Sequence, residues 1–253
     1  MGKEPQENLK TMSLGDHLEE LRARLILIIL GLVVGLIFCL FFGKFLVGLL
    51  AAPFAKATNS SDVLRHLQTI QPAEGFIVYI KVCLVFGLLI TSPWVFWQIW
   101  AFVSSGLYRR ERKFVYAVAP ISALLFITGA VFFIVIIAPL AMGFFIKFNE
   151  RLALASNWTF QSYINMVLAL TLVFGAAFQM PIAIVFAQMM GLVSIEALGR
   201  ARKFVILGLV IAAAMATPPD PISQLALAVP LYVLFEGSIL ICRFLQWRKS
   251  KTL

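Results

Sequence analysis

Six apolar runs divide this chain, and they constrain its fold more than any other feature. They cover residues 25–50, 76–102, 114–138, 162–192, 204–216 and 222–242. A membrane-spanning helix needs about 20 apolar residues, because the hydrocarbon core of a bilayer is about 30 Å thick. Hydrophobic residues make up 61% of the 253 positions and charged residues only 13%, which excludes an ordinary soluble domain and a disordered chain. The sequence therefore predicts an all-α, polytopic integral membrane protein with six transmembrane helices.

The Lys and Arg residues are distributed unevenly between the two sides of these runs. Fifteen of the 21 lie in residues 1–24, 103–113, 193–203 and 243–253. Short loops rich in Lys and Arg stay in the cytoplasm, so we expect both termini to be cytoplasmic. We expect a single membrane domain over residues 1–253. Its parts are a cytoplasmic amphipathic segment over residues 1–24, a six-helix bundle over residues 25–242 and a cytoplasmic tail over residues 243–253. The net charge of +9 then reflects topology and contact with anionic lipid rather than nucleic-acid binding.

The fifth run is shorter than a membrane crossing requires. Its 13 residues form a helix of only about 20 Å. Three prolines follow it closely, at 218, 219 and 221, and proline ends a helix because it lacks an amide donor. We therefore expect the last two transmembrane helices to be short, with the turn between them recessed below the outer membrane surface.

The polar residues of the chain give no sign of catalytic chemistry. The two histidines, His17 and His66, both lie outside the apolar runs, and no nucleotide, serine-hydrolase or zinc-protease motif is present. The sequence predicts neither an enzyme nor a metal or cofactor site. Gln179 and Glu236 are the candidate intramembrane polar residues. Glu236 lies seven residues before Arg243 on roughly the same helix face, so a structural ion pair and a functional acid both remain open.

Two carboxylates near the expected cytoplasmic surface each have an ordinary structural interpretation. Leucines recur at helical spacing from Leu14 to Leu25, which predicts a short interfacial helix before the first span. Within it, Glu20 and Arg24 are four residues apart and can form an ion pair on the helix surface. Glu111 stands among four basic residues, which is typical of a screened surface ion pair.

Four strings resemble the TatC family, the multispanning subunit of the twin-arginine protein translocase. They are HLEELRAR at residues 17–24, PAEGF at 72–76, LYRRER at 107–112 and TPPDPISQ at 217–224. The resemblance extends from about residue 13 to 243. It implies a receptor in the bacterial cytoplasmic (inner) membrane that binds the two consecutive arginines of a folded precursor's signal peptide, with export driven by the proton gradient.

The resemblance also implies roles for individual residues. Those matching the signal-peptide site are Glu20, Arg22, Phe102 and Glu111. Those matching the contact with the single-span partner subunits TatA and TatB are Met215, Thr217, Asp220 and Gln224. Self-association in a receptor complex is also implied. Gln179 departs from the family pattern, because many relatives carry glutamate there, which puts any role for an ionisable group at this position in doubt.

Two other functions fit the same hydropathy pattern. One is a secondary transporter of a small solute, with Glu236 and Asp220 as coupling acids. Such transporters often contain internal repeats with broken helices in corresponding halves, whereas both short spans here are adjacent in the second half. The other is a purely structural assembly scaffold. Binding of a twin-arginine peptide that is lost when both arginines become lysine would distinguish a receptor from either.

Overall fold

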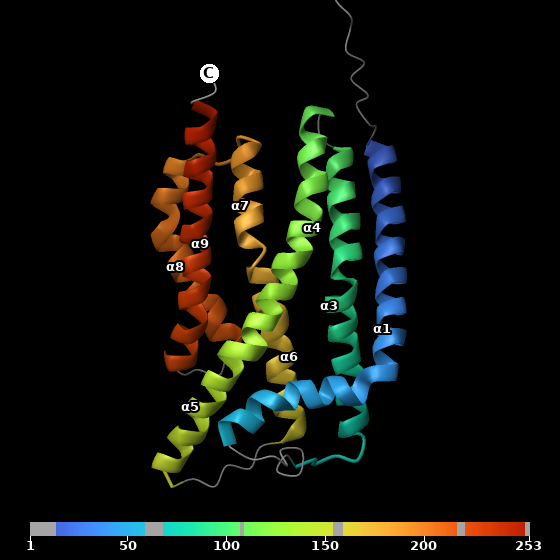
Figure 1. Cartoon of the computed structure of the whole chain (residues 1–253), viewed down its shortest axis with the longest axis vertical. Helices are drawn as coiled ribbons and strands as arrows, with labels where there is room; N and C mark the ends of the chain where they lie inside the picture. Colours follow the sequence, from blue (N-terminus) through green and yellow to red (C-terminus); the bar gives the residue numbers. More distant parts are fainter. Residues whose placement is uncertain (1–13, 59–67, 107–108, 154–158, 217–220, 251–253) are drawn as a thin grey trace, which may run out of the picture.

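The computed structural model describes residues 14–58, 68–106, 109–153, 159–216 and 221–250. Helices account for all the regular secondary structure in these ranges, apart from one isolated bridge between Gln68 and Thr159. They are α1 (Leu14–Thr58), α3 (Glu74–Ser105), α4 (Arg109–Phe132), the π-helix η1 (Phe133–Ile137), α5 (Ala138–Arg151), α6 (Phe160–Ala177), α7 (Met180–Met189), α8 (Ile195–Ala216) and α9 (Pro221–Ser250). Most run along the long axis of the molecule, and α1 begins at the end where α9 finishes (Figure 1).

Four of the expected spans are confirmed as long apolar helices within the described residues. They are Gly15–Phe54, Glu74–Ser105, Tyr116–Arg151 and Phe160–Met189. The fifth and sixth runs lie in α8 and α9, which fall outside that group. α8 is 22 residues long, not 13, because it begins nine residues before the apolar run and includes the basic positions from Arg200 to Lys203. The apolar part of this helix is nevertheless as short as expected.

The first helix differs from its prediction. The helix begins at Leu14, as predicted, but it continues directly into the first span, so a short interfacial helix that ends before the span is wrong. The 45-residue α1 is about 68 Å long, more than twice the hydrocarbon thickness, and its last part turns across one end of the bundle (Figure 1). The Tyr79 ring packs against Gly43, and its hydroxyl donates to the Leu40 carbonyl. This contact fastens α3 to α1 next to the bend.

The third and fourth spans contain irregular turns. The third continues past its expected end at residue 138, through η1 and Pro139 in the first turn of α5, to Arg151. A π turn holds one more residue than an α turn. The fourth span breaks between α6 and α7, at Phe178 and Gln179, where Pro181 lies in the first turn of the new helix. Proline is favoured there because the first amides of a helix have no intrahelical acceptor.

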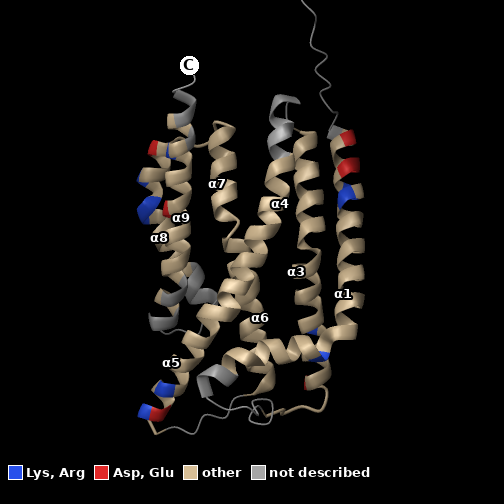
Figure 2. Ribbon diagram, in the orientation of Figure 1, with Lys and Arg blue, Asp and Glu red and all other residues tan. Residues whose placement is uncertain are grey.

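The outer surface of the bundle suits a lipid environment. Large apolar side chains are exposed on it, including Phe41 (82%), Phe45 (70%) and Leu140 (64%). The charged residues drawn in Figure 2 gather toward the two ends and leave a long uncharged middle. Such a surface is stable in hydrocarbon, whereas in water it would form an aggregation-prone apolar patch.

Close helix contacts in the core depend on glycine. A Cβ atom built on Gly35 of α1 would lie 2.9 Å from the Gly87 carbonyl oxygen of α3, and one built on Gly129 of α4 would lie 2.7 Å from the Phe174 carbonyl oxygen of α6. Small residues let membrane helices approach until their backbones touch, which is a main source of packing energy where the hydrophobic effect between helices is absent.

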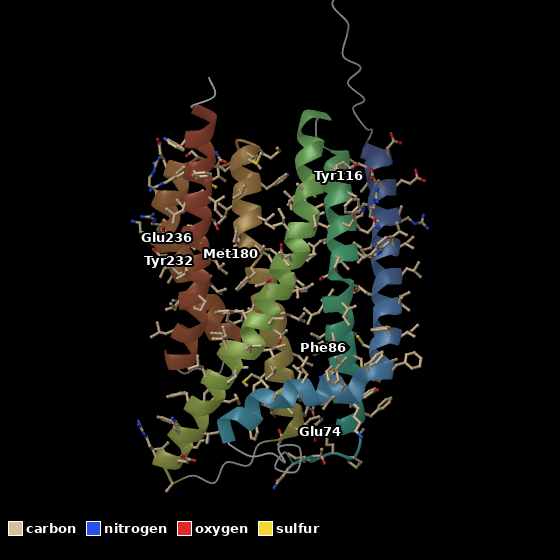
Figure 3. The ribbon with its side chains drawn as sticks, in the orientation of Figure 1. Glu74, Phe86, Tyr116, Met180, Tyr232 and Glu236 are labelled. Carbon is tan, nitrogen blue, oxygen red and sulfur yellow. The ribbon has the colours of Figure 1, made fainter. Side chains whose placement is uncertain are left out.

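A buried carboxylate organises the end of the bundle opposite the start of α1 (Figure 3). Glu74, in the first turn of α3, is only 2% exposed. Its two oxygens accept backbone N–H bonds from Ile70 (2.8 Å), Gln71 (3.3 Å) and Gln161 (2.8 Å). A single side chain therefore joins the segment before α3 to the start of α6.

Candidate functional site

The candidate site lies where the first turns of α1 pack against the last turns of α3. Five side chains form this contact, which we call the α1–α3 seam: His17, Glu20, Arg24, Gln98 and Phe102. The His17 ring stacks on the Phe102 ring, with centroids 4.6 Å apart and planes inclined by 27°. His17, Glu20 and Arg24 are spaced three and four residues apart, so they share one face of α1.

The seam belongs to a long antiparallel contact between the two helices. Its pairs are His17 with Phe102, Arg24 with Gln98, Leu27 with Trp94, Gly35 with Gly87 and Cys39 with Cys83. The residue numbers of each pair add up to about 120, so the register is constant along the contact. The close glycine contact thus fixes which residue of α3 lies opposite Glu20.

The polar contacts of the seam centre on one guanidinium group. Arg24 Nη1 donates to Gln98 Oε1 at 2.8 Å, and Arg24 Nη2 lies 3.4 Å from Glu20 Oε1. The predicted ion pair between Glu20 and Arg24 is therefore confirmed. Only 22% of the Glu20 side chain is exposed, so this carboxylate is less hydrated than an ordinary surface acid. A partly desolvated carboxylate interacts more strongly with a cation than one in bulk water.

Two other residues expected at this site, Arg22 and Glu111, are not seen in the α1–α3 seam. Arg22 is exposed on α1 and lies two positions from Glu20, about 200° around the helix, so it does not join the seam. Glu111 lies in the first turn of α4, which begins at the end of the bundle where α3 finishes (Figure 1). Its side chain lies outside the described part of the structure.

Of the four expected partner-contact residues, the structure describes one side chain. Thr217 and Asp220 lie outside the described residues, as does the side chain of Met215 in the last turn of α8. Gln224, near the start of α9, donates its Nε2 to the Val210 carbonyl of α8 at 2.9 Å. This amide therefore ties the two helices together at the end nearest their connecting turn.

Glu236 pairs with a residue that the sequence did not suggest. Its carboxylate accepts one hydrogen bond from Arg202 Nη2 of α8 (2.9 Å) and one from the Tyr232 hydroxyl (2.9 Å). Arg202 Nε lies 2.8 Å from Glu236 Oε1 in the same ion pair, without hydrogen-bond geometry. Figure 3 shows Glu236 and Tyr232 side by side on α9. The proposed pair with Arg243 on the same helix is wrong, because Glu236 points to the neighbouring helix.

Removing Arg202 should destabilise the contact between α8 and α9. In an Arg202→Met variant the Glu236 carboxylate, whose side chain is 27% exposed, loses its counter-ion. We expect a cost of roughly 1–2 kcal/mol in detergent, reduced by the partial exposure of the pair. The Arg202→Met/Glu236→Leu double variant should regain most of the loss, because no charge is left unpaired. Thermal unfolding measures both. An Arg202→Met melting temperature equal to that of the parent would contradict this assignment.

The Gln179 side chain forms a structural hydrogen bond to a backbone carbonyl. Its Nε2 donates to the Ser122 carbonyl of α4 at 2.8 Å, while the Ser122 hydroxyl accepts from Trp100 Nε1 of α3 at 2.8 Å. The amide therefore bridges α4 and the break between α6 and α7. A neutral side chain suffices for this contact.

The sequence did not predict the roles of two residues that join separate helices, Glu74 and Gln98. Glu74 lies in one of the family-like strings, but no role followed from it. The signal for it was a carboxylate two residues after Pro72 and two before the second apolar run, where the first backbone amides of a helix are free to donate. Gln98 has no predicted role either, since nothing in the sequence places it opposite Arg24. Among the described residues, no three His, Cys, Asp or Glu side chains gather to hold a metal ion.

Comparison with known proteins identifies the family. The family model described as "Sec-independent protein translocase protein (TatC)" matches residues 16–230. The chain is 32% identical to the Sec-independent protein translocase protein TatC of Rickettsia prowazekii (strain Madrid E), covering 94% of this chain and 95% of that one. It is 33% identical to the TatC protein of Escherichia coli (strain K12), covering 92% and 89%.

Solved structures agree with the sequence match. A crystal structure titled Twin Arginine Translocase Receptor TatC aligns with a TM-score of 0.78 and 34% identity, over 90% of this chain and 98% of that chain. A second, in DDM, aligns with a TM-score of 0.79 and 32% identity, over 89% and 98%. The chain therefore belongs to the TatC family and is a multi-spanning membrane subunit of the twin-arginine, Sec-independent protein translocase, a transport component and not an enzyme.

Proposed function

We propose that this chain is the receptor subunit that binds the Arg-Arg signal peptide of folded precursors, through Glu20 and Glu111. The observation that carries the proposal is Glu20, a partly desolvated carboxylate held in the α1–α3 seam beside Phe102. The first turn of α4, which carries Glu111, begins at the same end of the bundle (Figure 1). Arg22 contributes from the exposed face of α1.

The chemistry of this site suits arginine better than lysine. A carboxylate accepts two parallel bonds from the planar guanidinium fork, whereas an ammonium is a compact and strongly hydrated point charge. The basic residues around the site repel a cationic peptide only weakly beyond about 8 Å at physiological salt. Local contacts with Glu20 and Glu111 can therefore outweigh the overall positive charge of this surface.

We propose six membrane crossings with both termini in the cytoplasm of a bacterial inner membrane, and one membrane domain over residues 1–253. The uneven distribution of Lys and Arg supports this orientation. The common end at which α1 begins and α9 finishes supports an even number of crossings (Figure 1). In this arrangement α8 and α9 are the fifth and sixth crossings, and the α1–α3 seam faces the cytoplasm. α9 is 30 residues long, so the expectation of a short helix holds only for the apolar part of α8.

Partners of the TatA and TatB kind would dock where α8 and α9 are connected, at Met215, Thr217, Asp220 and Gln224. The short apolar part of α8 supports this, because it leaves polar backbone and side chains at membrane depth that a neighbouring helix can satisfy. Assembly into a multi-copy receptor complex and use of the proton gradient complete the proposal. A small-solute transporter is not proposed, because Arg202 already neutralises Glu236.

Replacing Glu20 by glutamine should weaken signal-peptide binding at least about tenfold, since a charged hydrogen bond contributes about 1.5–3 kcal/mol. Glu111→Gln should act in the same direction. The measurement is titration calorimetry of the full-length protein in detergent with a twin-arginine signal peptide and with its double-lysine version. Both variants should still insert in the membrane.

Glu19→Gln is the matched control for Glu20→Gln. It removes the same charge from the neighbouring position, which is exposed and faces away from α3. We expect binding within about twofold of the parent, as for most surface substitutions. Equal heats for the twin-arginine and double-lysine peptides, or equal effects of Glu19→Gln and Glu20→Gln, would reject the site.

A further inference from the structure

Arg24 offers Glu20 the same chemical group that the proposed signal peptide would bring. Its side chain is 30% exposed, and it contacts Glu20 through Nη2 while Nη1 is bound to Gln98. Gln98 is only 3% exposed, so its amide oxygen is a fixed acceptor on α3. The α1–α3 seam therefore contains its own guanidinium–carboxylate contact.

The contact is weaker than the geometry of the two groups allows. An end-on fork places both terminal nitrogens of a guanidinium on one carboxylate at about 2.7–2.9 Å. Here the two nitrogens are divided between two residues, and the bond to Glu20 Oε1 is 3.4 Å long. Gln98 holds Nη1 at 2.8 Å and so prevents the end-on fork.

We propose that Arg24 is an internal substitute for the signal-peptide arginine, occupying Glu20 when no peptide is bound, and that Gln98 keeps this contact weak enough to be displaced. The inference rests on the proposed function of Glu20. Between binding events, Arg24 satisfies a carboxylate that would otherwise be partly buried and unpaired. When a peptide arrives, its guanidinium fork replaces the single long bond. When the peptide leaves, Arg24 returns and favours release.

Replacing Arg24 should tighten peptide binding, whereas structural damage to the site would weaken it. Arg24→Gln should lower the Kd of the twin-arginine peptide about two- to fivefold, the scale of a partly exposed ion pair. Arg24→Lys keeps the charge and most of the length but replaces the two-nitrogen fork, which contacts Gln98 and Glu20 at once, with a compact and strongly hydrated ammonium. It should also tighten binding, which separates loss of the contact from loss of positive charge.

Removing the hydrogen bond between Gln98 and Arg24 should have the opposite effect. Gln98→Met has similar volume and lacks the amide acceptor, so Arg24 becomes free to place its full fork on Glu20 and compete more strongly. Binding should weaken about two- to fivefold, on the same scale. In the Gln98→Met/Arg24→Gln double variant the competitor is gone, and the affinity should return to that of Arg24→Gln alone.

The experiment is titration of the full-length protein in detergent with the twin-arginine peptide, for the parent and these variants, with melting temperature as a check of folding. Weaker or unchanged binding by both Arg24→Gln and Arg24→Lys overturns the proposal and makes Arg24 a positioning residue. If the Gln98→Met/Arg24→Gln double variant binds the peptide as weakly as Gln98→Met, Gln98 does not act by restraining Arg24. Should Arg24→Gln be unstable, Arg24→Lys decides alone.

Glu20→Gln in the same titration separates the two levels of inference. If it leaves twin-arginine binding unchanged, the proposed site itself fails, whatever Arg24 does. If it weakens binding while neither Arg24 variant tightens it, the receptor proposal stands and only the internal substitute is wrong.

Discussion

Replacing Glu74 by alanine should lower the stability of the detergent-solubilised protein by roughly 3–5 kcal/mol. The substitution leaves three backbone N–H groups without their acceptor, at a carboxylate that is 2% exposed. A fully buried donor left unpaired costs about 1–3 kcal/mol. These three bonds are part-buried, so water recovers part of that cost. Because Gln161 begins α6, the tie between the start of α3 and the start of α6 is lost together with the local bonds.

The Glu74 prediction is measured by thermal unfolding in detergent. Glu74→Gln should fall between the parent and Glu74→Ala, because an amide keeps one acceptor oxygen and loses the charge. Glu150→Ala removes an exposed carboxylate at the same end of the bundle and should change little. A Glu74→Ala protein that unfolds together with Glu150→Ala would show that the three bonds contribute nothing to stability.

Substituting leucine for Gly35 should force α1 away from α3 and lower the stability of the protein by about 3 kcal/mol or more. A Cβ atom alone would approach the Gly87 carbonyl oxygen to 2.9 Å and Thr91 Cγ2 to 2.5 Å. Backbone cannot move aside as a flexible side chain can, so the helices must shift or rotate. Overpacking typically costs about 1–3 kcal/mol, and a branched side chain between two touching backbones lies at the upper end or beyond.

A graded series tests the glycine contact. Gly87→Ala, whose Cβ would lie 3.0 Å from the Leu36 amide nitrogen, should be milder than Gly35→Leu. Gly48→Leu is the matched control, since no atom lies within 4 Å of a Cβ at this position of the same helix. Monodispersity in detergent and melting temperature are the measurements, with peptide binding as a further readout because the glycine contact fixes the register of the α1–α3 seam. Normal behaviour of Gly35→Leu would refute the close approach.

Hydropathy predicted the parts of the fold that depend on burial in lipid. The first four spans follow from long apolar runs, because the bilayer sets a minimum length that few other environments require. Helix ends were less well predicted, since a helix can continue through polar residues once neighbouring helices support it. α1 therefore continues without a break from its predicted start at Leu14 into its apolar run, and α5 continues beyond Pro139.

The spacing of residues along the chain could not predict contacts between segments that are far apart in the sequence. The pair between Glu20 and Arg24 was predicted because both residues lie on one helix, four positions apart. The partners Gln98 and Arg202 lie 74 and 34 positions away from Arg24 and Glu236, and one sequence contains no measure of that proximity. The candidate carboxylates of the site came from family resemblance, whereas the Gln98 contact that holds Arg24 depends on how α1 packs against α3.

The π-helical turn η1 has a consequence for how this part of the chain can vary in evolution. Because the turn already holds a surplus residue, loss of one residue between Phe133 and Ile137 could convert it to ordinary α-helix and leave the side chains on either side in phase with their neighbours. A deletion elsewhere in the same span would rotate everything after it by about 100°. Length variation among homologues should therefore concentrate at this turn.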